Sequence, residues 1–427
     1  MSLSAGVARE IISPDIGTVL FGYLQCPVSH SIHDDLTVTA LALESNGTAL
    51  LLLSATVCLF NNSLADEIRM QVGIAAGIPA EQVILSATHT HSGPYTDEHI
   101  ALGSIDRDYC DRILIPKCIA AGRNAMNTRQ PVKMGIGTTE SLVGVNRRQM
   151  LRDGSIILGQ NPWGIYDPIM TVITFAGKDD KPLANLVHIG AHSTAAGISH
   201  EITRDWPGIM IDRLDEESGA ITLFFNGTAG DVAPRIANGG STGNMRYSME
   251  IGSLAGIDAV RAFKSIRTYR DEPLAFTLGD IKLPFKAPYP VEKIPERLKV
   301  IGNKWCWERF SLEQLAALYE TGEMGPEALH YRQTIIRIGP VALVPFPFEI
   351  CSEIGLRLRD YSPFAHTLLL SCTNGSNSYL VTQNQICQGG YEVEEFYWFR
   401  PCQLPDNADA MLIEKNLRLL DKVYYFC

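Results

Sequence analysis

The 427-residue sequence contains no hydrophobic run long enough to cross a membrane. Its longest apolar run, residues 49–60, is interrupted by Ser54 and Thr56 and is shorter than the about 20 residues that a spanning helix needs. Residues 1–6 lack the basic and apolar segments of a secretory signal. We therefore expect a cytoplasmic protein that does not act in a membrane.

Basic residues are few relative to acidic ones. Lys and Arg number 36 against 47 Asp and Glu, a formal net charge of −11, and no basic stripe is visible. Such a surplus of negative charge repels nucleic acids and anionic lipid surfaces. The expected partner is a small-molecule substrate, with no nucleic acid and no membrane. The sequence does not define the oligomeric state.

The sequence also lacks a Cys-x-x-Cys motif and any closely spaced cysteine pair. Its cysteines stand singly, several of them inside apolar runs, which favours buried, reduced thiols over disulfides. They are Cys26, Cys58, Cys110, Cys118, Cys306, Cys351, Cys372, Cys387, Cys402 and Cys427.

The composition itself is that of an ordinary globular protein. It is 46% hydrophobic and 19% charged, enough to bury a large core as one big domain or two. Short apolar runs alternate along the chain with segments that have the apolar periodicity of a helix. This pattern predicts an α+β or mixed α/β fold with mixed β-sheets flanked by helices. Predicted strands cover residues 37–44, 48–54, 83–87, 171–176, 186–190, 221–225, 275–285, 334–344 (a hairpin) and 367–371, and predicted helices cover 64–76, 106–126, 205–217, 245–266, 350–359 and the residues after Pro405.

Turn residues mark several of these boundaries. The Ser-Asn-Gly sequence at 45–47 predicts a hairpin turn, and Gly77 is expected to end the helix over 64–76. Pro116 is expected to kink or break the helix over 106–126. Residues 286–304, rich in Pro, Lys and Glu, are the best candidate for a long surface loop or insertion.

The most informative segment is 83–94, where an apolar strand runs into His89, His91 and a Ser-Gly-Pro turn. Residues two apart on a strand point to the same face, so both histidines are expected to reach one small site. Imidazole is the commonest metal ligand and a general acid or base near neutral pH. The alternative is two half-exposed histidines on a strand without a metal.

Three other segments have a similar form. Residues 186–193 carry His188 and His192, four apart, and 224–234 form an apolar strand that opens into a Gly-rich turn. Glu349 follows five apolar or proline residues, and a carboxylate in such a setting needs a cation, either an arginine or a metal. Two distant histidines and one glutamate form a donor set that suits zinc.

Together these motifs resemble the neutral/alkaline non-lysosomal ceramidases, zinc amidases of N-acylsphingosines. The resemblance rests on Thr-His-Thr-His-Ser-Gly-Pro at 88–94, His192 followed by Asp-Trp-Pro-Gly at 205–208, and Gly-Thr-Ala-Gly-Asp-Val-Ala-Pro at 227–234. It also rests on Glu349 with Gly-Leu-Arg-Leu-Arg at 355–359, and on Tyr379 with Tyr391. The motifs keep the family's order from about residue 6 to 400. The resemblance implies one zinc hydrolase catalytic domain over residues 1–427, with its site at strand ends.

The resemblance also implies roles for individual residues. The zinc ligands would be His89, His192, Glu349 and Tyr379, while His91, Arg147 (which follows Asn146) and Tyr391 would surround the reacting amide. Arg147 and the tyrosine hydroxyls would donate hydrogen bonds to the developing oxyanion, and His91 would move the proton. From the residues alone, Arg147 beside Arg148 is equally well a surface cation, and both tyrosines are equally well core residues.

Two departures from the family pattern concern the substrate. Where the ceramidases have a serine thought to take part in attack on the amide, this chain has Gly227, which with Asn226 and Thr228 is predicted to line the substrate pocket. Gly227 would widen that pocket, or it serves the backbone conformation alone. The family's C-terminal β-sandwich domain has no counterpart here, so we expect the lipid-handling part to be missing.

Other polar residues near these motifs are predicted to be structural. His188 and His200 match nothing in the family. Asp231 is expected to bond loop amides, and Asp205 is either a helix cap or a partner of His192.

The leading hypothesis is a zinc-dependent hydrolase that cleaves an amide, or an ester or lactone, of a soluble substrate by metal-activated water. One alternative is a ligand-binding protein on the same fold that has lost catalysis. The other is a metallophosphoesterase-like enzyme, which a single His/His/Glu/Tyr set disfavours because a two-metal site needs further carboxylates.

Overall fold

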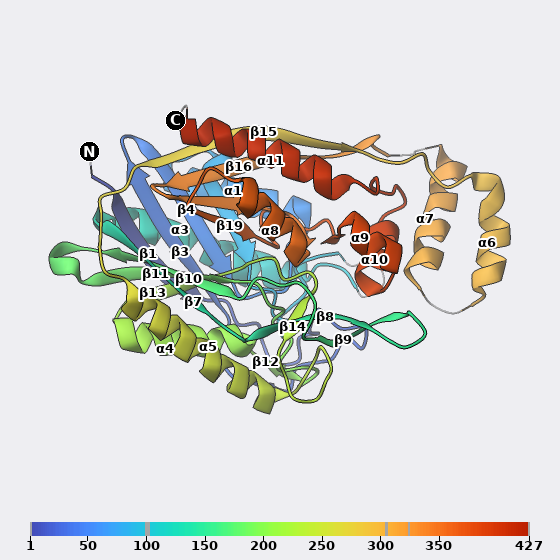
Figure 1. Cartoon of the computed structure of the whole chain (residues 1–427), viewed down its shortest axis with the longest axis horizontal. Helices are drawn as coiled ribbons and strands as arrows, with labels where there is room; N and C mark the ends of the chain where they lie inside the picture. Colours follow the sequence, from blue (N-terminus) through green and yellow to red (C-terminus); the bar gives the residue numbers. More distant parts are fainter. Residues whose placement is uncertain (1, 99–102, 304–305, 323–324, 426–427) are drawn as a thin grey trace.

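Three β-sheets form the centre of the protein, and helices cover their outer faces (Figure 1). The computed structural model describes residues 2–98, 103–303, 306–322 and 325–425. The strands of these sheets are β1 (Ser4–Ile11), β3 (Thr37–Ser45), β4 (Thr48–Ala55), β5 (Val83–Ala87), β6 (Gln130–Pro131), β7 (Lys133–Glu140), β10 (Ile169–Ala176), β11 (Pro182–Ile189), β13 (Ile221–Asn226), β15 (Leu274–Pro284), β16 (Ala328–Ile338), β17 (Val341–Pro345) and β19 (His366–Leu370).

All three large sheets are mixed, as predicted. Their orders are β5-β4-β3-β1-β6, β13-β11-β10-β7 and β15-β16-β17-β19. In each sheet one pair is parallel, namely β4 with β5, β11 with β13, and β17 with β19, while the other pairs are antiparallel. Smaller sheets join β2 (Ser31–Ile32) to β12 (Glu201–Ile202), β8 (Gly144–Met150) to β9 (Ile156–Asn161) and β14 (Val232–Pro234), and β18 (Glu349–Ile350) to β20 (Tyr379–Leu380).

The helices are α1 (Asn62–Ala76), α2 (Arg107–Tyr109), α3 (Ile115–Asn127), α4 (Asp205–Ser218), α5 (Met245–Ser265), α6 (Ile294–Ile301), α7 (Trp307–Thr321), α8 (Ser352–Tyr361), α9 (Gln383–Gln388), α10 (Tyr391–Trp398) and α11 (Ala408–Tyr425). Short turns of helix lie at η1 (Ala80–Gln82), η2 (Cys110–Leu114), η3 (Lys178–Asp180) and η4 (Val291–Lys293). Figure 1 shows α4 and α5 along one long side and α11 along the opposite side. No described helix is both long and apolar enough to traverse a bilayer.

The central strands bury both of their faces, which explains their continuous apolar runs. On β4, Leu50 and Leu52 pack into a core shared by all three sheets, whereas Leu51 and Leu53 pack toward α1 and α3. Alternate residues of a strand point to opposite faces, so a strand covered on both sides needs apolar residues at every position. Helices α4 and α5 cover the second sheet, and α8 and α11 cover the third.

Several predicted boundaries are confirmed. Asn46 and Gly47 both have positive φ values, 53° and 80°, in the turn between β3 and β4, and Gly77 ends α1 in the left-handed conformation. The break expected at Pro116 takes the form of the π-helical turn η2 just before α3. Proline has no N–H and its ring clashes with the carbonyl four residues earlier, here that of Arg112, so regular α-helix cannot pass through.

One prediction was wrong in part. Residues 286–304 are not a long loop, because η4 and α6 lie within this stretch, with Pro295 at the start of α6 where a missing N–H does no harm. Lys304 lies outside the described residues. Together α6 and α7 form a helical pair that projects from one end of the protein (Figure 1), held by a small apolar cluster around Ile294, Leu312 and Leu315.

The nine described cysteines are all free thiols, as predicted. Cys58, Cys110, Cys118, Cys351 and Cys372 are buried. Cys387 is exposed on α9, so the expectation of burial does not hold there. Cys427 lies outside the described residues.

The contact between β7 and α5 gives a test of the packing. A Cβ at Gly137 would lie 1.9 Å from the carbonyl oxygen of Ala262, so Gly137→Ala should push α5 away and lower the free energy of unfolding by about 1–3 kcal/mol. Urea denaturation measures this change. Gly240→Ala is the control, because its Cβ would meet nothing closer than 3.5 Å. Equal losses in both variants would contradict the proposed packing.

Candidate metal centre and cavity

The parallel strand pairs of the three large sheets end at one place, and the predicted metal ligands follow those ends. His89 comes after β5, His192 comes after β11, and Glu349 follows β17. The Nε2 atoms of His89 and His192 lie 3.2 Å and 3.0 Å from Oε2 of Glu349. All three side chains are buried, and their ligand atoms could hold one metal ion. The carboxyl ends of parallel strands are where α/β folds commonly place their sites.

His89 does not continue strand β5, which corrects the expected geometry of the first motif. Its φ is 68°, in the left-handed region. Its N–H donates to the carbonyl of Val57 at 3.0 Å, so the chain turns beside the end of β4 instead of alternating faces. His91 nevertheless reaches the same place, since its Nε2 lies 3.2 Å from Nε2 of His89. The two histidines meet through this turn and not through strand alternation.

Backbone carbonyls fix the orientation of both predicted histidine ligands. The Nδ1–H of His89 donates to the carbonyl of Cys58 at 3.0 Å, and that of His192 donates to the carbonyl of Ala229 at 2.7 Å. This assignment of the protons leaves each Nε2 as a lone pair directed at Glu349. Histidines that bind metals are usually held by such a bond on the other ring nitrogen.

Three lone-pair acceptors therefore converge on one point, and Oε2 of Glu349 has no hydrogen-bond donor among the described residues. Burial raises the pKa of Glu349, but the charges of His89 and His192 outweigh burial and lower it well below its usual range. Burial, followed by the positive charge of Arg147, lowers the pKa of His192 to about 4. The pKa of His89 is lowered by burial but raised more by Glu349 and Cys372, so that it ends well above its ordinary value. The centre requires one positive charge, which a metal cation or a proton on His89 would supply.

Tyr379 and Arg147 complete the centre. Tyr379 pairs with Glu349 through the parallel strands β20 and β18, and its hydroxyl lies 3.4 Å from Nε2 of His192. Nη2 of Arg147 donates to that hydroxyl at 2.9 Å. The guanidinium of Arg147 also lies over the rings of Tyr379 and Tyr391, at 5.4 Å and 6.0 Å from their centroids. The structure thus brings together His89, His91, Arg147, His192, Glu349, Tyr379 and Tyr391.

Glu392, which the sequence analysis missed, holds Arg147 in place. Its buried carboxylate accepts from Nε of Arg147 at 2.8 Å and from Nη1 of Arg148 at 2.7 Å. A register shift in β8 between Asn146 and Arg148 lets these adjacent arginines reach the same acid. Arg147 is only 4% exposed, so the surface-cation alternative is wrong. The sequence carries little signal for this role, because Glu392 stands among other glutamates in the run Tyr-Glu-Val-Glu-Glu-Phe at 391–396.

A cavity of about 310 Å³ opens onto this centre. One part of its wall is apolar, and the other carries five residues of the centre and two further acids, whereas His192 and Arg147 lie behind the lining. Its lining comprises Phe21, Gly22, Leu24, Cys58, Leu59, His89, His91, Cys306, Trp307, Glu349, Tyr379, Tyr391, Glu394 and Glu395. The ring of Tyr23 packs edge-on against His91, with centroids 4.9 Å apart. Cys58 and His91 form a second group with His89 that could hold an ion.

The predicted pocket residues Asn226, Gly227 and Thr228 do not line this cavity. A Cβ at Gly227 would lie 2.9 Å from the backbone nitrogen of Gly190 and 3.0 Å from Nε2 of His188. Asn226 bonds the backbone of Ala191 with both ends of its amide. This packing favours the conformational interpretation of Gly227, in which close approach of two backbones requires a glycine.

The remaining polar residues have structural partners. His188 bonds the carbonyl of Leu369 at 2.8 Å, and His200 bonds that of Val28 at 3.0 Å. Asp231 accepts from the N–H of Ser352 at the start of α8, as predicted. Asp205 is the first residue of α4, whose N-cap is Arg204, and its carboxylate accepts from the N–H groups of Ala196 and Trp206 and does not form a standard helix cap.

Comparison with known proteins identifies the fold. No protein-family model and no curated protein sequence matches the chain. Two solved structures superimpose on it, each covering 99% of this chain and 75% of the other. One is described as ceramidase complexed with C2, with a TM-score of 0.78 and 17% sequence identity. The other is neutral ceramidase from Pseudomonas aeruginosa, with a TM-score of 0.76 and 18% identity.

The protein is therefore a mixed α/β protein with a candidate metal centre at its strand ends. Its fold is that of the neutral ceramidases, which confirms the resemblance drawn from the sequence motifs and the predicted fold class.

Metal content tests the centre directly. We expect one zinc ion per chain, and His89→Ala and His192→Ala should each weaken zinc binding by more than about 100-fold, since loss of a mere supporting partner costs about 10- to 100-fold. Elemental analysis and competition with a chromophoric chelator measure this. His330→Ala, at a side chain 60% exposed on β16, is the control. Undiminished zinc in the double variant His89→Ala/His192→Ala would refute the assignment.

Gly227→Ala separates the two interpretations of that glycine. Because the new Cβ would press on Gly190 and His188, we expect the free energy of unfolding to fall by about 1–3 kcal/mol, with zinc content unchanged. Gly177→Ala, whose Cβ would meet nothing closer than 3.5 Å, is the matched control. A narrower ligand range at unchanged stability would instead show that residue 227 contributes space to the pocket.

Proposed function

We propose that the protein is a zinc-dependent hydrolase that cleaves an amide bond, or an ester or lactone, of a small soluble substrate. The observation that carries this proposal is the convergence of two oriented imidazole Nε2 atoms and an unpartnered carboxylate oxygen at the floor of a cavity. Neutral imidazoles and a carboxylate are the ligands of catalytic zinc sites. The neutral ceramidase fold supports the same class of chemistry by analogy.

His89, His192, Glu349 and Tyr379 would hold the ion. Zinc, when bound, polarises a substrate carbonyl and lowers the pKa of water to about 7. Tyr379 differs from the other three because its hydroxyl also accepts a hydrogen bond from Arg147 at 2.9 Å. That bond leaves the hydroxyl proton free to point elsewhere, and it places a fixed positive charge beside the centre.

Arg147 is suited to stabilise negative charge that develops on the substrate. Burial lowers its pKa, but Tyr379 and Glu392 outweigh burial and raise it well above the ordinary value, so the guanidinium stays charged. Glu392 binds Nε, which fixes the plane of the group. A preorganised donor in a site that excludes water is the arrangement that stabilises an oxyanion most strongly.

His91 is suited to move a proton. It borders the cavity, and its Nε2 lies 3.2 Å from that of His89. Burial, followed by the charges of His89 and His192, lowers its pKa well below the ordinary value, so the ring is neutral, and its Nδ1 has no hydrogen-bond partner among the described residues. Tyr391 also lines the cavity, and its ring packs edge-on against that of Tyr379 with centroids 5.8 Å apart.

The segment where the ceramidases carry a serine offers no nucleophile here. Residue 227 is a glycine, and the side chain of Thr228 packs against Gly355 on α8. This supports attack by water over attack by a side chain of that segment.

The cavity supports a small substrate. Its volume of about 310 Å³ is at the lower end of the range of about 300–1,000 Å³ that is typical of small-molecule sites. Phe21, Leu24, Leu59 and Trp307 give it an apolar side, so an acyl group or another short apolar group would fit against that wall.

Turnover tests the proposal. Short-chain N-acyl p-nitroanilides and p-nitrophenyl esters should be hydrolysed by the zinc-loaded protein, and chelation should abolish hydrolysis. Arg147→Ala should lower kcat/KM by about 10²- to 10³-fold with zinc still bound, as expected for loss of an oxyanion donor. Arg246→Ala, at a side chain 83% exposed on α5, is the control. Undiminished turnover without metal, or no turnover of any substrate by the loaded protein, would refute the proposal, and the latter would favour a binding protein.

A further inference from the structure

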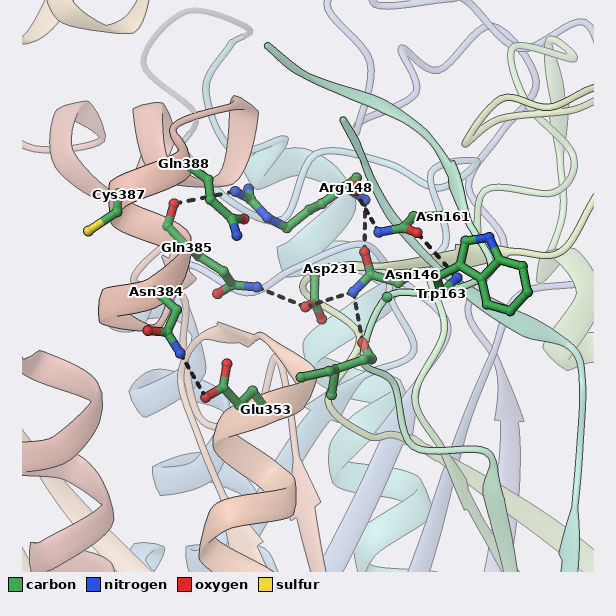
Figure 2. A pocket seen from close by; sticks show the side chains of 12 residues that line it. Asn146, Arg148, Asn161, Trp163, Asp231, Glu353, Asn384, Gln385, Cys387 and Gln388 are labelled. Carbon is green, nitrogen blue, oxygen red and sulfur yellow. Dashed lines mark hydrogen bonds between the residues drawn. The ribbon is translucent and has the colours of Figure 1, made fainter. Parts of the chain in front are cut away.

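A second cavity, of about 520 Å³, lies between α9 and the strands β8 and β9. Figure 2 shows Asn384, Gln385 and Gln388 on one side of it and Asn146, Asn161 and Trp163 on the other. The two cavities share no lining residue. Arg148 lies in the wall of this second cavity, while its neighbour Arg147 contacts the metal centre.

The floor of this cavity is rigid because its polar groups already bind one another (Figure 2). Oδ2 of Asp231 accepts from the amides of Asn146 at 3.2 Å and Gln385 at 2.9 Å. Oδ1 of Asp231 accepts from the N–H of Ser352 at 2.7 Å. The floor formed by Asn146, Asp231 and Gln385 is therefore fixed before any ligand arrives, which lowers the entropic cost of binding against it.

Several polar groups in the wall remain available to a ligand. The amide of Gln388 has no hydrogen bond among the described residues, and that of Asn384 has only one long contact, at 3.4 Å to Glu353. Arg148 itself offers little to a ligand, because it is 5% exposed and its Nε–H, which has no partner among the residues described, is buried. An amide both donates and accepts hydrogen bonds, as a hydroxyl group does.

Trp163 lies at the rim and is 93% exposed. Its backbone N–H donates to the side chain of Asn161 at 3.2 Å, and Gly164 follows it where a Cβ would collide with Asn146. The backbone that carries the indole is thus fixed, although the ring itself has almost no cover. A large apolar ring held in water beside an array of amides is suited to stack on a flat face that has polar groups at its edges.

The charges of the lining exclude ionic ligands. The cation, Arg148, already binds the carboxylate of Glu392 and the carbonyl of Gly389, so an anion would find no unpaired positive partner. Asp231 already accepts from the amides of Asn146 and Gln385 and from the N–H and hydroxyl of Ser352. Glu353 accepts from Thr382 and Asn384. An uncharged ligand with many hydroxyl groups matches what is left.

We infer that this second cavity binds a saccharide. A pyranose ring has a flat C–H face that can stack on Trp163 and a rim of hydroxyl groups that can pair with Asn384, Gln388 and Glu353. The inference does not depend on the proposed hydrolase activity, because it concerns separate residues and a separate readout.

Saturation-transfer NMR and titration of tryptophan fluorescence test the inference on the full chain. The probes are glucose, N-acetylglucosamine, maltose and cellobiose, each added in millimolar amounts. Trp163→Ala removes the stacking ring, and Gln388→Ala removes an amide. Both positions are exposed, so neither change should disturb folding. Tyr361→Ala, at an aromatic side chain 75% exposed at the end of α8, is the matched control.

At least one of these saccharides should bind the wild type, and Trp163→Ala should weaken that binding by about tenfold or more. Gln388→Ala should weaken it by a smaller factor, and Tyr361→Ala should leave it unchanged. No binding by any of the four probes, or equal binding by wild type and Trp163→Ala, would overturn the inference. Binding of inorganic phosphate or acetate to this cavity in preference to the saccharides would overturn it as well.

Discussion

The convergence of Glu349 with His89 and His192 is the interaction on which the candidate site depends. Each of these residues follows a different sheet, so the centre forms only when all three sheets are packed around their common core. A buried carboxylate costs several kcal/mol unless it is paired, and here its oxygen faces two imidazole lone pairs. A positive charge at this point therefore links the ends of the three sheets. The sheets position the ligands, and the charge in turn holds the sheet ends together.

The two arginines on β8 form a second set of buried charge contacts that joins separate elements of the fold. Arg147 and Arg148 both bind Glu392 on α10, and the backbone N–H of Arg147 donates to the carbonyl of Asp231 at 2.8 Å. Asp231 in turn binds the start of α8, the helix that follows Glu349. The metal centre on one side and the polar cavity on the other thus share one framework of buried charges. A change in that framework would be felt in both places, because neither arginine can move without leaving Glu392 unpaired.

The sequence predicted the strands well because a strand that is buried on both faces needs a continuous apolar run. Few other elements of secondary structure require such a run. The sequence pointed to His89, His192 and Glu349, which the structure brings together, because histidine and glutamate are conspicuous at the ends of such runs. It could not predict the left-handed turn at His89, since the turn is imposed by hydrogen bonds to Val57 after β4, distant in sequence. Glu392 was missed for a related reason, because its two arginine partners lie about 245 residues earlier. Gly227, just after β13, was assigned to the pocket by analogy with a serine, whereas its close packing against Gly190 favours the conformational interpretation.

Backbone strain also occurs around the same centre. Three of the nine described non-glycine residues with positive φ values lie there: His89, a candidate ligand, Cys372 beside it, and Ser378 next to Tyr379. Such conformations cost of order 1–3 kcal/mol each when the residue is not glycine, a large share of the about 5–15 kcal/mol that separates folded from unfolded chains. A fold selected for stability alone would relax these residues and replace Glu349 by an apolar side chain. The chain keeps both the strained residues and the buried charge. The rest of the structure, in which helices cover sheets that are buried on both faces, therefore stabilises the chain enough to hold these groups in a geometry that they would not adopt alone.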